Sequence, residues 1–84
     1  MKNGYLIKRK YINSNNRKAT DYMFLYTDRG VTHPSFSNKP QATAIDENVV
    51  DQWLDKARGA CGSEDVLEAI ENTSKPPFVY SEEP

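Results

Sequence analysis

His33 and Cys61 are the residues whose side chains could carry out acid–base or covalent chemistry, and each residue type occurs once in the chain. A histidine acts as a general base only with a nucleophile and an orienting group within hydrogen-bond reach. Cys61 lies in a glycine-containing link, where a thiol could be activated, but a single cysteine in a small domain is usually a buried or incidental thiol. We therefore predict no catalytic residue and a chain that is not an enzyme.

The spacing of polar residues indicates neither a metal site nor a phosphate-binding loop. One histidine, one cysteine and dispersed carboxylates form no ligand pattern. The four glycines match neither the dinucleotide-binding fingerprint nor the P-loop. The sequence thus predicts no metal and no cofactor, and it directs attention to surfaces that bind macromolecules.

The clearest secondary-structure signal is an amphipathic helix over residues 46–59, DENVVDQWLDKARG. Its apolar residues recur at helical spacing and form one stripe: Val49, Val50, Trp53, Leu54 and Ala57. We expect Asp46 to cap the first turn and Gly59 to end the helix in a left-handed conformation. Trp53 is predicted to point inward, against a sheet.

A second, shorter helix is predicted after the link at residues 59–62. Ser63 is a suitable N-cap, and the following apolar residues fit one helical face: Val66, Leu67, Ala69 and Ile70. Pro76 and Pro77 would end this helix. Residues 76–84 then form a C-terminal tail, which either docks through the apolar triplet at residues 78–80 or is disordered.

The first half of the chain is rich in aromatic and β-branched residues, which predicts strands. The segment from Tyr5 to Ile12 alternates imperfectly and is interpreted as an edge or one-sided strand. Residues 13–19 are polar and rich in asparagine, which is typical of a hairpin loop. The segment from Asp21 to Thr27 is apolar on both faces and predicts a central strand.

A tight turn at residues 27–30, with Gly30 at the position that needs a positive φ, leads into a third strand. This strand begins at Val31 and extends at most to Phe36. Pro34 and Pro40 interrupt ladder pairing and indicate an edge, a bulge or an open loop. Residues 42–45 are predicted to form a short fourth strand.

Strand signals that are bunched ahead of helix signals predict an α+β fold, with a three- to four-stranded antiparallel sheet followed by two α-helices packed on one face. The length of 84 residues fits one domain. We place this domain at residues 1–75, ahead of the tail. No apolar run approaches a membrane span or the core of a signal peptide, and the single cysteine agrees with a reducing compartment, so a cytoplasmic address is expected.

Charge is distributed unevenly along the chain, although its net value is −1. Residues 1–40 contain eight basic and two acidic residues, whereas residues 41–84 contain three basic and ten acidic ones. If the halves form opposite faces, a basic sheet side stands against an acidic helix side. The alternative is that helix starts favour carboxylates and strand edges tolerate lysines.

One functional hypothesis is nucleic-acid binding by a basic, aromatic sheet. Phosphates would be contacted by Lys8, Lys10, Arg17, Lys18 and Arg29, and bases would stack on Tyr11, Tyr22 or Tyr26. Three strands followed by the helix near AIDENVVDQWL resemble, in element order over residues 4–59, the arm-type DNA-binding domain of tyrosine integrases. That resemblance implies a sheet that enters the major groove, whereas the acidic second half of the chain opposes it.

The preferred hypothesis is a small protein-binding module, an inhibitor or adaptor that acts on another protein. Aromatic residues commonly anchor interfaces, and the candidates are Tyr5, Tyr11, Tyr22 and Tyr26. Acidic residues of the second half could occupy a partner's nucleic-acid channel as phosphate mimics, and the candidates are Asp51, Asp55, Glu64 and Asp65.

In element order the chain is similar to small phage-encoded inhibitors, including anti-CRISPR proteins whose antiparallel sheet precedes two helices. The segment DENVVDQWLDKARGACGSEDVLEAIE resembles their helical half. This resemblance implies a partner protein and assigns no functional residue. Two alternatives stay open: the tyrosines only cover the sheet, or they line a contact between two copies of the chain.

Overall fold

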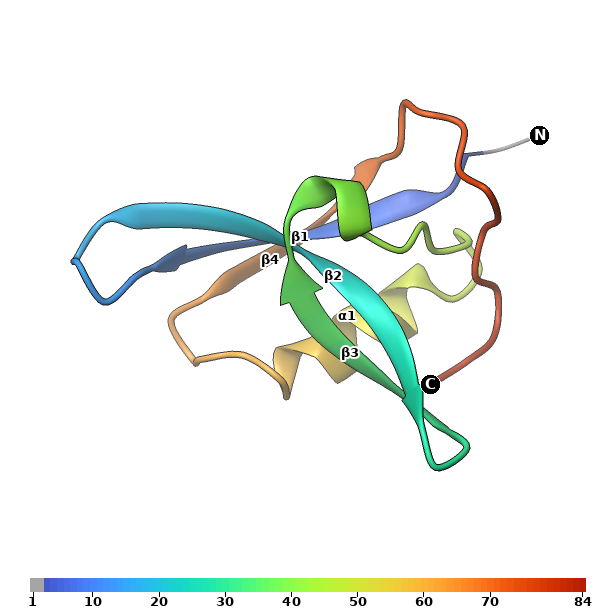
Figure 1. Ribbon diagram of the computed structural model, residues 1–84, viewed down its shortest axis with the longest axis horizontal. Coiled ribbons are helices and arrows are strands. Elements are labelled where there is room, and N and C mark those ends of the chain that lie inside the picture. Colours follow the sequence, from blue (N-terminus) through green and yellow to red (C-terminus); the bar gives the residue numbers. More distant parts are fainter. Residues whose placement is uncertain (1–2) are drawn as a thin grey trace.

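The computed structural model describes residues 3–84, which form one open antiparallel sheet and one α-helix (Figure 1). In chain order the elements are β1 (Tyr5–Ile12), β2 (Lys18–Asp28), β3 (Val31–Ser37), the short 3₁₀ helix η1 (Lys39–Gln41), α1 (Val50–Arg58) and β4 (Val66–Glu71). The strands lie in the order β3-β2-β1-β4. The predicted α+β class and antiparallel sheet are confirmed.

The prediction of a second helix is wrong, because its residues form β4, which pairs with β1 from Val66 to Glu71. A short apolar run fits a helix or a strand equally well, and periodicity alone does not distinguish them. The link before β4 is held by Arg58, whose guanidinium donates to the backbone carbonyls of Gly62 and Asp65. The amide of Gly62 donates to Asp65 Oδ2 at 3.0 Å. This link, which consists of turns, returns the chain to the sheet, and the residues of β4 are extended.

The interpretation of β1 as an edge strand is also wrong, because β1 lies between β2 and β4. Its basic side chains are accommodated without an edge. Lys8 lies 4.0 Å from Glu68 on β4, and Arg9 pairs with Asp21 on β2. β1 is central because β4 pairs with its second edge, whereas the sequence pattern predicts a helix for the residues of β4.

The β2–β3 hairpin turns at Arg29 and Gly30, which both have positive φ (53° and 80°), as a two-residue hairpin of this twist requires. The positive φ predicted for Gly30 is confirmed. β3 continues to Ser37 and pairs with β2 throughout, including Pro34 opposite Leu25. The interruption predicted at Pro34 therefore does not occur, and β3 is an edge strand.

β2 is shared between two hairpins that point in different directions in Figure 1. Its first half pairs with β1 as far as Tyr22, and its second half, from Tyr22 onward, pairs with β3. Where β1 and β2 diverge, the segment after η1 fills the gap. Thr43 donates its amide to the carbonyl of Met23 (3.1 Å), and Ile45 exchanges two backbone hydrogen bonds of 2.8 Å with Tyr5. The predicted fourth strand at residues 42–45 is thus reduced to isolated bridges at Ile45.

α1 is shorter than predicted and is capped differently. Asp46 Oδ1 accepts from the amide of Asn48 (2.8 Å), so this carboxylate stabilises the turn before the helix and not its first turn. The N-cap is Val49, without a side-chain hydrogen bond. Gly59 has φ −73°, a right-handed conformation, so the predicted left-handed end is wrong.

Trp53 is fully buried, as its place on the helical stripe predicts, and packs in a core with Ile7, Met23 and Ile45. Its indole N–H donates to the backbone carbonyl of Glu82 at 2.8 Å. The C-terminal residues are therefore part of the packed structure. Tyr80 forms a parallel bridge with Ile45 and meets the indole edge-to-face, with ring centroids 5.7 Å apart.

Arg9 is the polar counterpart of this core on the same side of the sheet. Its Nε and Nη2 donate to the two carboxylate oxygens of Asp21 at 2.8 and 2.5 Å, and its Nη1 lies 3.7 Å from Asp65 Oδ2. The guanidinium is 4.3 Å from each of the ring centroids of Tyr11 and Phe36. The bidentate pairing and these stacking contacts fit the planar guanidinium and would not fit a lysine.

The hydrogen bond from Arg9 to Asp21 raises the pKa of the guanidinium, against a smaller opposing effect of burial. Because the pKa of the folded state is raised, this stabilisation is complete below the ordinary arginine pKa. It is lost only as the pH rises through the raised value. Arg9 thus keeps its charge throughout the physiological range.

Removal of residues 78–84 is expected to lower the free energy of unfolding by about 2–4 kcal/mol, because the hydrogen bonds of Trp53, Tyr80 and Asp46 across this segment are lost. Since Trp53 is the only tryptophan, its emission should shift to the red in the truncated protein. Urea unfolding followed by this fluorescence measures both effects. Removal of Pro84 alone is the control and should change neither, and an unshifted emission in the long truncation would contradict the assigned contacts.

Asp21→Asn is expected to lower the free energy of unfolding by about 1–3 kcal/mol, because it leaves the half-buried Arg9 without its bidentate partner. Thermal or chemical unfolding measures the loss. Asp28→Asn, at the exposed end of the same strand, is the matched control and should stay within about 0.5 kcal/mol of the parent. Equal effects of the two substitutions would refute the role given to Asp21.

Candidate functional site

The two faces of the sheet differ in what covers them. α1 covers the face that carries Ile7, Met23 and Leu67, which belong to or pack against the core around Trp53. Side chains alternate along a strand, so the opposite face is formed by the intervening residues. We call this the open face, and its members are Leu6, Lys8, Lys10, Ile12, Lys18, Thr20, Tyr22, Phe24, Tyr26, Asp28, Val31, His33, Ser35, Ser37, Val66, Glu68 and Ile70. Leu6 alone among them is buried, close to η1 and residues 74–77.

Aromatic residues are concentrated on the open face where β2 pairs with β3. The rings of Phe24 and Tyr26 are 6.2 Å apart, and those of Tyr26 and His33, directly opposite each other, are 5.5 Å apart. Lys39 Nζ, from η1, lies 6.0 Å from the ring of Tyr22. Tyr26 remains 46% exposed. We call Tyr22, Phe24, Tyr26 and His33 the aromatic patch.

The aromatic patch reaches the end of α1 at the β3 edge. Tyr26, His33 and Pro34 line a shallow depression together with Asp55, Lys56, Gly59 and Ala60 of α1 and the residues after it. Two residues that the sequence singled out for protein binding, Tyr26 and Asp55, are thereby brought to one surface. The phenol of Tyr26 therefore lies near the carboxylate of Asp55 and the ammonium of Lys56. An aromatic anchor with charged groups around it is typical of protein interfaces.

Basic residues occupy the same open face towards the β1–β2 hairpin. Lys8, Lys10 and Lys18 alternate with residues of the other face, and Lys8 lies directly opposite Tyr22 in the ladder. Lys10 and Lys18 are exposed, whereas Lys8 is near Glu68. Arg17 lies in the hairpin loop and Arg29 at the opposite turn. The structure thus groups three of the five predicted phosphate contacts.

The remaining predicted residues lie elsewhere. Tyr11 and Asp65 belong to the Arg9 cluster inside the fold, and Tyr5 packs against the core from the α1 side. Asp51 is exposed on α1, and Glu64 is exposed in the link before β4. The prediction of a basic sheet against acidic helices also needs correction, because β4 brings Glu68 and Glu71 into the sheet.

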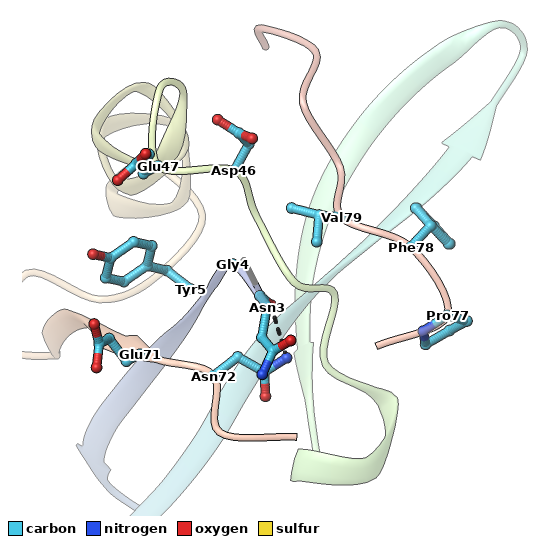
Figure 2. Close-up of a pocket in the computed structure, with 10 residues that line it drawn as sticks. All are labelled: Asn3, Gly4, Tyr5, Asp46, Glu47, Glu71, Asn72, Pro77, Phe78 and Val79. Atoms are coloured by element: carbon cyan, nitrogen blue, oxygen red, sulfur yellow. Dashed lines mark hydrogen bonds between the residues drawn. The ribbon is translucent and has the colours of Figure 1, made fainter. Parts of the chain in front are cut away.

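A groove of about 900 Å³ lies between the start of β1, the end of β4 and the C-terminal residues (Figure 2). In Figure 2 the ring of Tyr5 lies between the carboxylates of Glu47 and Glu71, with Pro77 and Phe78 across the groove. The lining of the groove contains three carboxylates, those of Asp46, Glu47 and Glu71. Among the described residues that line it, none has a basic side chain. Phe78, 63% exposed, stands at this groove. Sequence reasoning missed the groove because its walls come from four separate segments, at residues 3–5, 46–47, 71–72 and 77–79.

His33 and Cys61, the two residues considered for catalysis, contact one ring and one backbone carbonyl respectively. His33 contacts the ring of Tyr26, and Cys61 is a free thiol that donates to the carbonyl of Arg58 at 3.7 Å. Within residues 3–84, no three side chains of the His, Cys, Asp and Glu types are close enough together to hold a metal ion. Across the same residues, no helix has the length and apolar character needed to cross a membrane.

Comparisons of the whole chain with protein-family models, with curated proteins and with solved structures found no match. The candidate site therefore rests on its own geometry, which is an aromatic patch on an open sheet face, flanked by lysines on one side and by the end of α1 on the other.

Proposed function

We propose that this protein is a small non-enzymatic protein-binding module, an inhibitor or adaptor that acts through the open face of its sheet. The observation that carries the proposal is the aromatic patch, in which the half-covered rings of Phe24 and His33 lie on either side of the exposed ring of Tyr26 in the contact series. Rigid aromatic side chains bury much area at little entropic cost, so they dominate the energetics of interfaces.

The surroundings of the patch agree with an interface of moderate size. Exposed apolar side chains lie at both ends of the open face, Val31 near the patch and Ile12 and Val66 near the other hairpin. Charged groups border them, namely Lys10, Lys18 and, at the end of α1, Asp55 and Lys56. Aromatic and apolar side chains bordered by charged groups are common in non-obligate protein interfaces.

Tyr26→Ala is expected to weaken partner binding at least about tenfold, because it removes the exposed anchor of the patch. The partner can be captured with a photo-crosslinking amino acid at position 26 and its affinity then measured with the purified pair. Phe78→Ala is the matched control, since Phe78 is an exposed aromatic residue, more exposed than Tyr26, that lies at the groove. A partner that binds both variants like the parent would contradict the proposal.

Nucleic-acid binding is the second candidate, and one observation favours it. The open face places Lys8, Lys10 and Lys18 beside Tyr22 and the rest of the aromatic patch, which is the combination of phosphate contacts and stacking platforms used for single strands. Glu68, on the same face beside Lys8, reduces its positive charge.

If nucleic acid is the partner, Lys10→Glu should weaken binding of a labelled single-stranded oligonucleotide by at least about fivefold and lower its salt dependence. Fluorescence anisotropy at low and moderate salt measures both quantities. Lys75→Glu makes the same change in net charge in the segment after β4, near Leu6 at the other end of β1 from Lys10, and is the matched control. Equal loss in the two variants would indicate an unspecific charge effect, and no binding at low salt would eliminate this candidate.

A further inference from the structure

The two edges of the sheet are β3 and β4. An edge strand presents unpaired N–H and C=O groups to which another strand can add, and proteins commonly protect such edges with proline, lysine, bulges or covering segments. Which backbone groups are free follows from the register, because alternate residues of an antiparallel strand point their hydrogen-bonding groups to opposite sides.

On β4, the free groups belong to Leu67, Ala69 and Glu71. The amide of Asn72 donates to the carbonyl of Gly4 at 3.0 Å, which extends the β1–β4 register by one pair. The N–H and C=O of Tyr5 are engaged with Ile45, on the other side of β1. Hydrogen-bonded pairs with β1 therefore fall at Val66, Glu68 and Ile70, and the residues between them face outward.

On β3, the same argument places Thr32, Pro34 and Phe36 outward. The carbonyl of Met23 and the amide of Leu25 on β2 are engaged with Thr43, away from β3, so the alternate residues of β2 bond β3. Pro34, opposite Leu25, is thus the middle outward residue of its strand and has no N–H to offer. The β3 edge is blocked at its centre.

The β4 edge has no such protection. The sequence VLEAIE contains neither proline nor lysine, and at the position equivalent to Pro34 it has Ala69. Val66 is 54% exposed, and the side chain of Glu68 is 43% exposed. Three free donors and three free acceptors therefore follow one another along a regular strand.

Charge determines which strand this edge would accept. Residues 59–74 contain four acidic side chains, Glu64, Asp65, Glu68 and Glu71, and no basic one. A second copy of β4 would place the same acidic set beside the first, which like-charge repulsion disfavours. A basic strand is favoured, and β1 already shows the pattern, since it places Leu6, Lys8 and Lys10 opposite Ile70, Glu68 and Val66.

We infer that the free edge of β4 binds an extended, basic segment of a partner protein by β-strand addition, with a lysine or arginine beside Glu68 and apolar residues around it. This site is separate from the aromatic patch and does not depend on which macromolecule the patch binds.

The probe is a capped synthetic peptide with the sequence of β1, YLIKRKYI, and its control has glutamate at the three basic positions. Amide hydrogen exchange of the labelled full-length protein is followed by NMR. In the free protein, the amides of Leu67, Ala69 and Glu71 should exchange faster than those of Val66, Glu68 and Ile70. The basic peptide should slow these three outward amides, and the acidic peptide should not.

Two variants test the backbone and the charge separately. Ala69→Pro, which copies Pro34 of the other edge, should abolish peptide binding. Glu68→Lys keeps the backbone and should weaken binding by roughly five- to thirtyfold, as expected for reversal of one cross-strand charge pair. Trp53 emission reports whether each variant is folded, and should Ala69→Pro unfold, Glu68→Lys alone decides. Glu64→Lys, in the link outside β4, is the charge-matched control and should retain binding.

Slowed exchange at the β3 edge, at the aromatic patch or at no site with millimolar basic peptide would overturn the inference. Slowing that depends on protein concentration without peptide would show that a second copy occupies the edge, and it would overturn the assigned partner. The Tyr26→Ala variant should lose binding of the partner at the aromatic patch and keep binding of the peptide at β4. The two proposals can therefore fail independently of each other.

Discussion

The burial of Trp53 is the constraint on which the other contacts depend. Its ring packs with Ile7, Met23 and Ile45, residues that lie where β1 and β2 diverge. A sheet that splits in this way would otherwise leave both an open core and unpaired backbone groups. Ile45 fills the gap and pairs with Tyr5 on one side and Tyr80 on the other. The indole N–H cannot be buried without a partner, and the carbonyl of Glu82 supplies one. One aromatic side chain thus connects α1, the sheet and the C-terminal residues.

A second constraint is that β1, a strand in the middle of the sheet, contains the basic residue Arg9 on its α1 side. A guanidinium on the α1 side is tolerated because its hydrogen bonds and its faces are both satisfied, by Asp21 and by the rings of Tyr11 and Phe36. Asp65 adds a second carboxylate from the link before β4. Two segments far apart in sequence are thereby held against β1, and Tyr11 and Asp65 are used for the fold itself.

These internal demands decide which surfaces remain for a partner. Helix α1 covers only one face of the sheet, so the aromatic patch and the lysines of the β1–β2 hairpin stay together on the other. The two sheet edges also differ. Pro34 blocks the addition of a strand at β3, and β4 contains no proline that would block it. The protein thus has one surface formed by side chains, the open face, and one formed by free backbone groups, the β4 edge.

The sequence by itself determined the local features: the three strands of the first half, the turn at Gly30, the amphipathic helix around Trp53, and the alternation that puts Tyr22, Phe24 and Tyr26 on one face. Each of these depends on periodicity or on one residue's backbone preference, which are properties of neighbouring residues. Only the tertiary structure decided that VLEAIE is a strand, that β1 is central and that Tyr5 and Tyr11 face inward. The first two outcomes depend on the pairing of β4 with β1, from Lys10 opposite Val66 to Tyr5 opposite Glu71, because a short apolar run adopts whichever conformation its long-range partner completes. The third depends on which face of the sheet α1 covers.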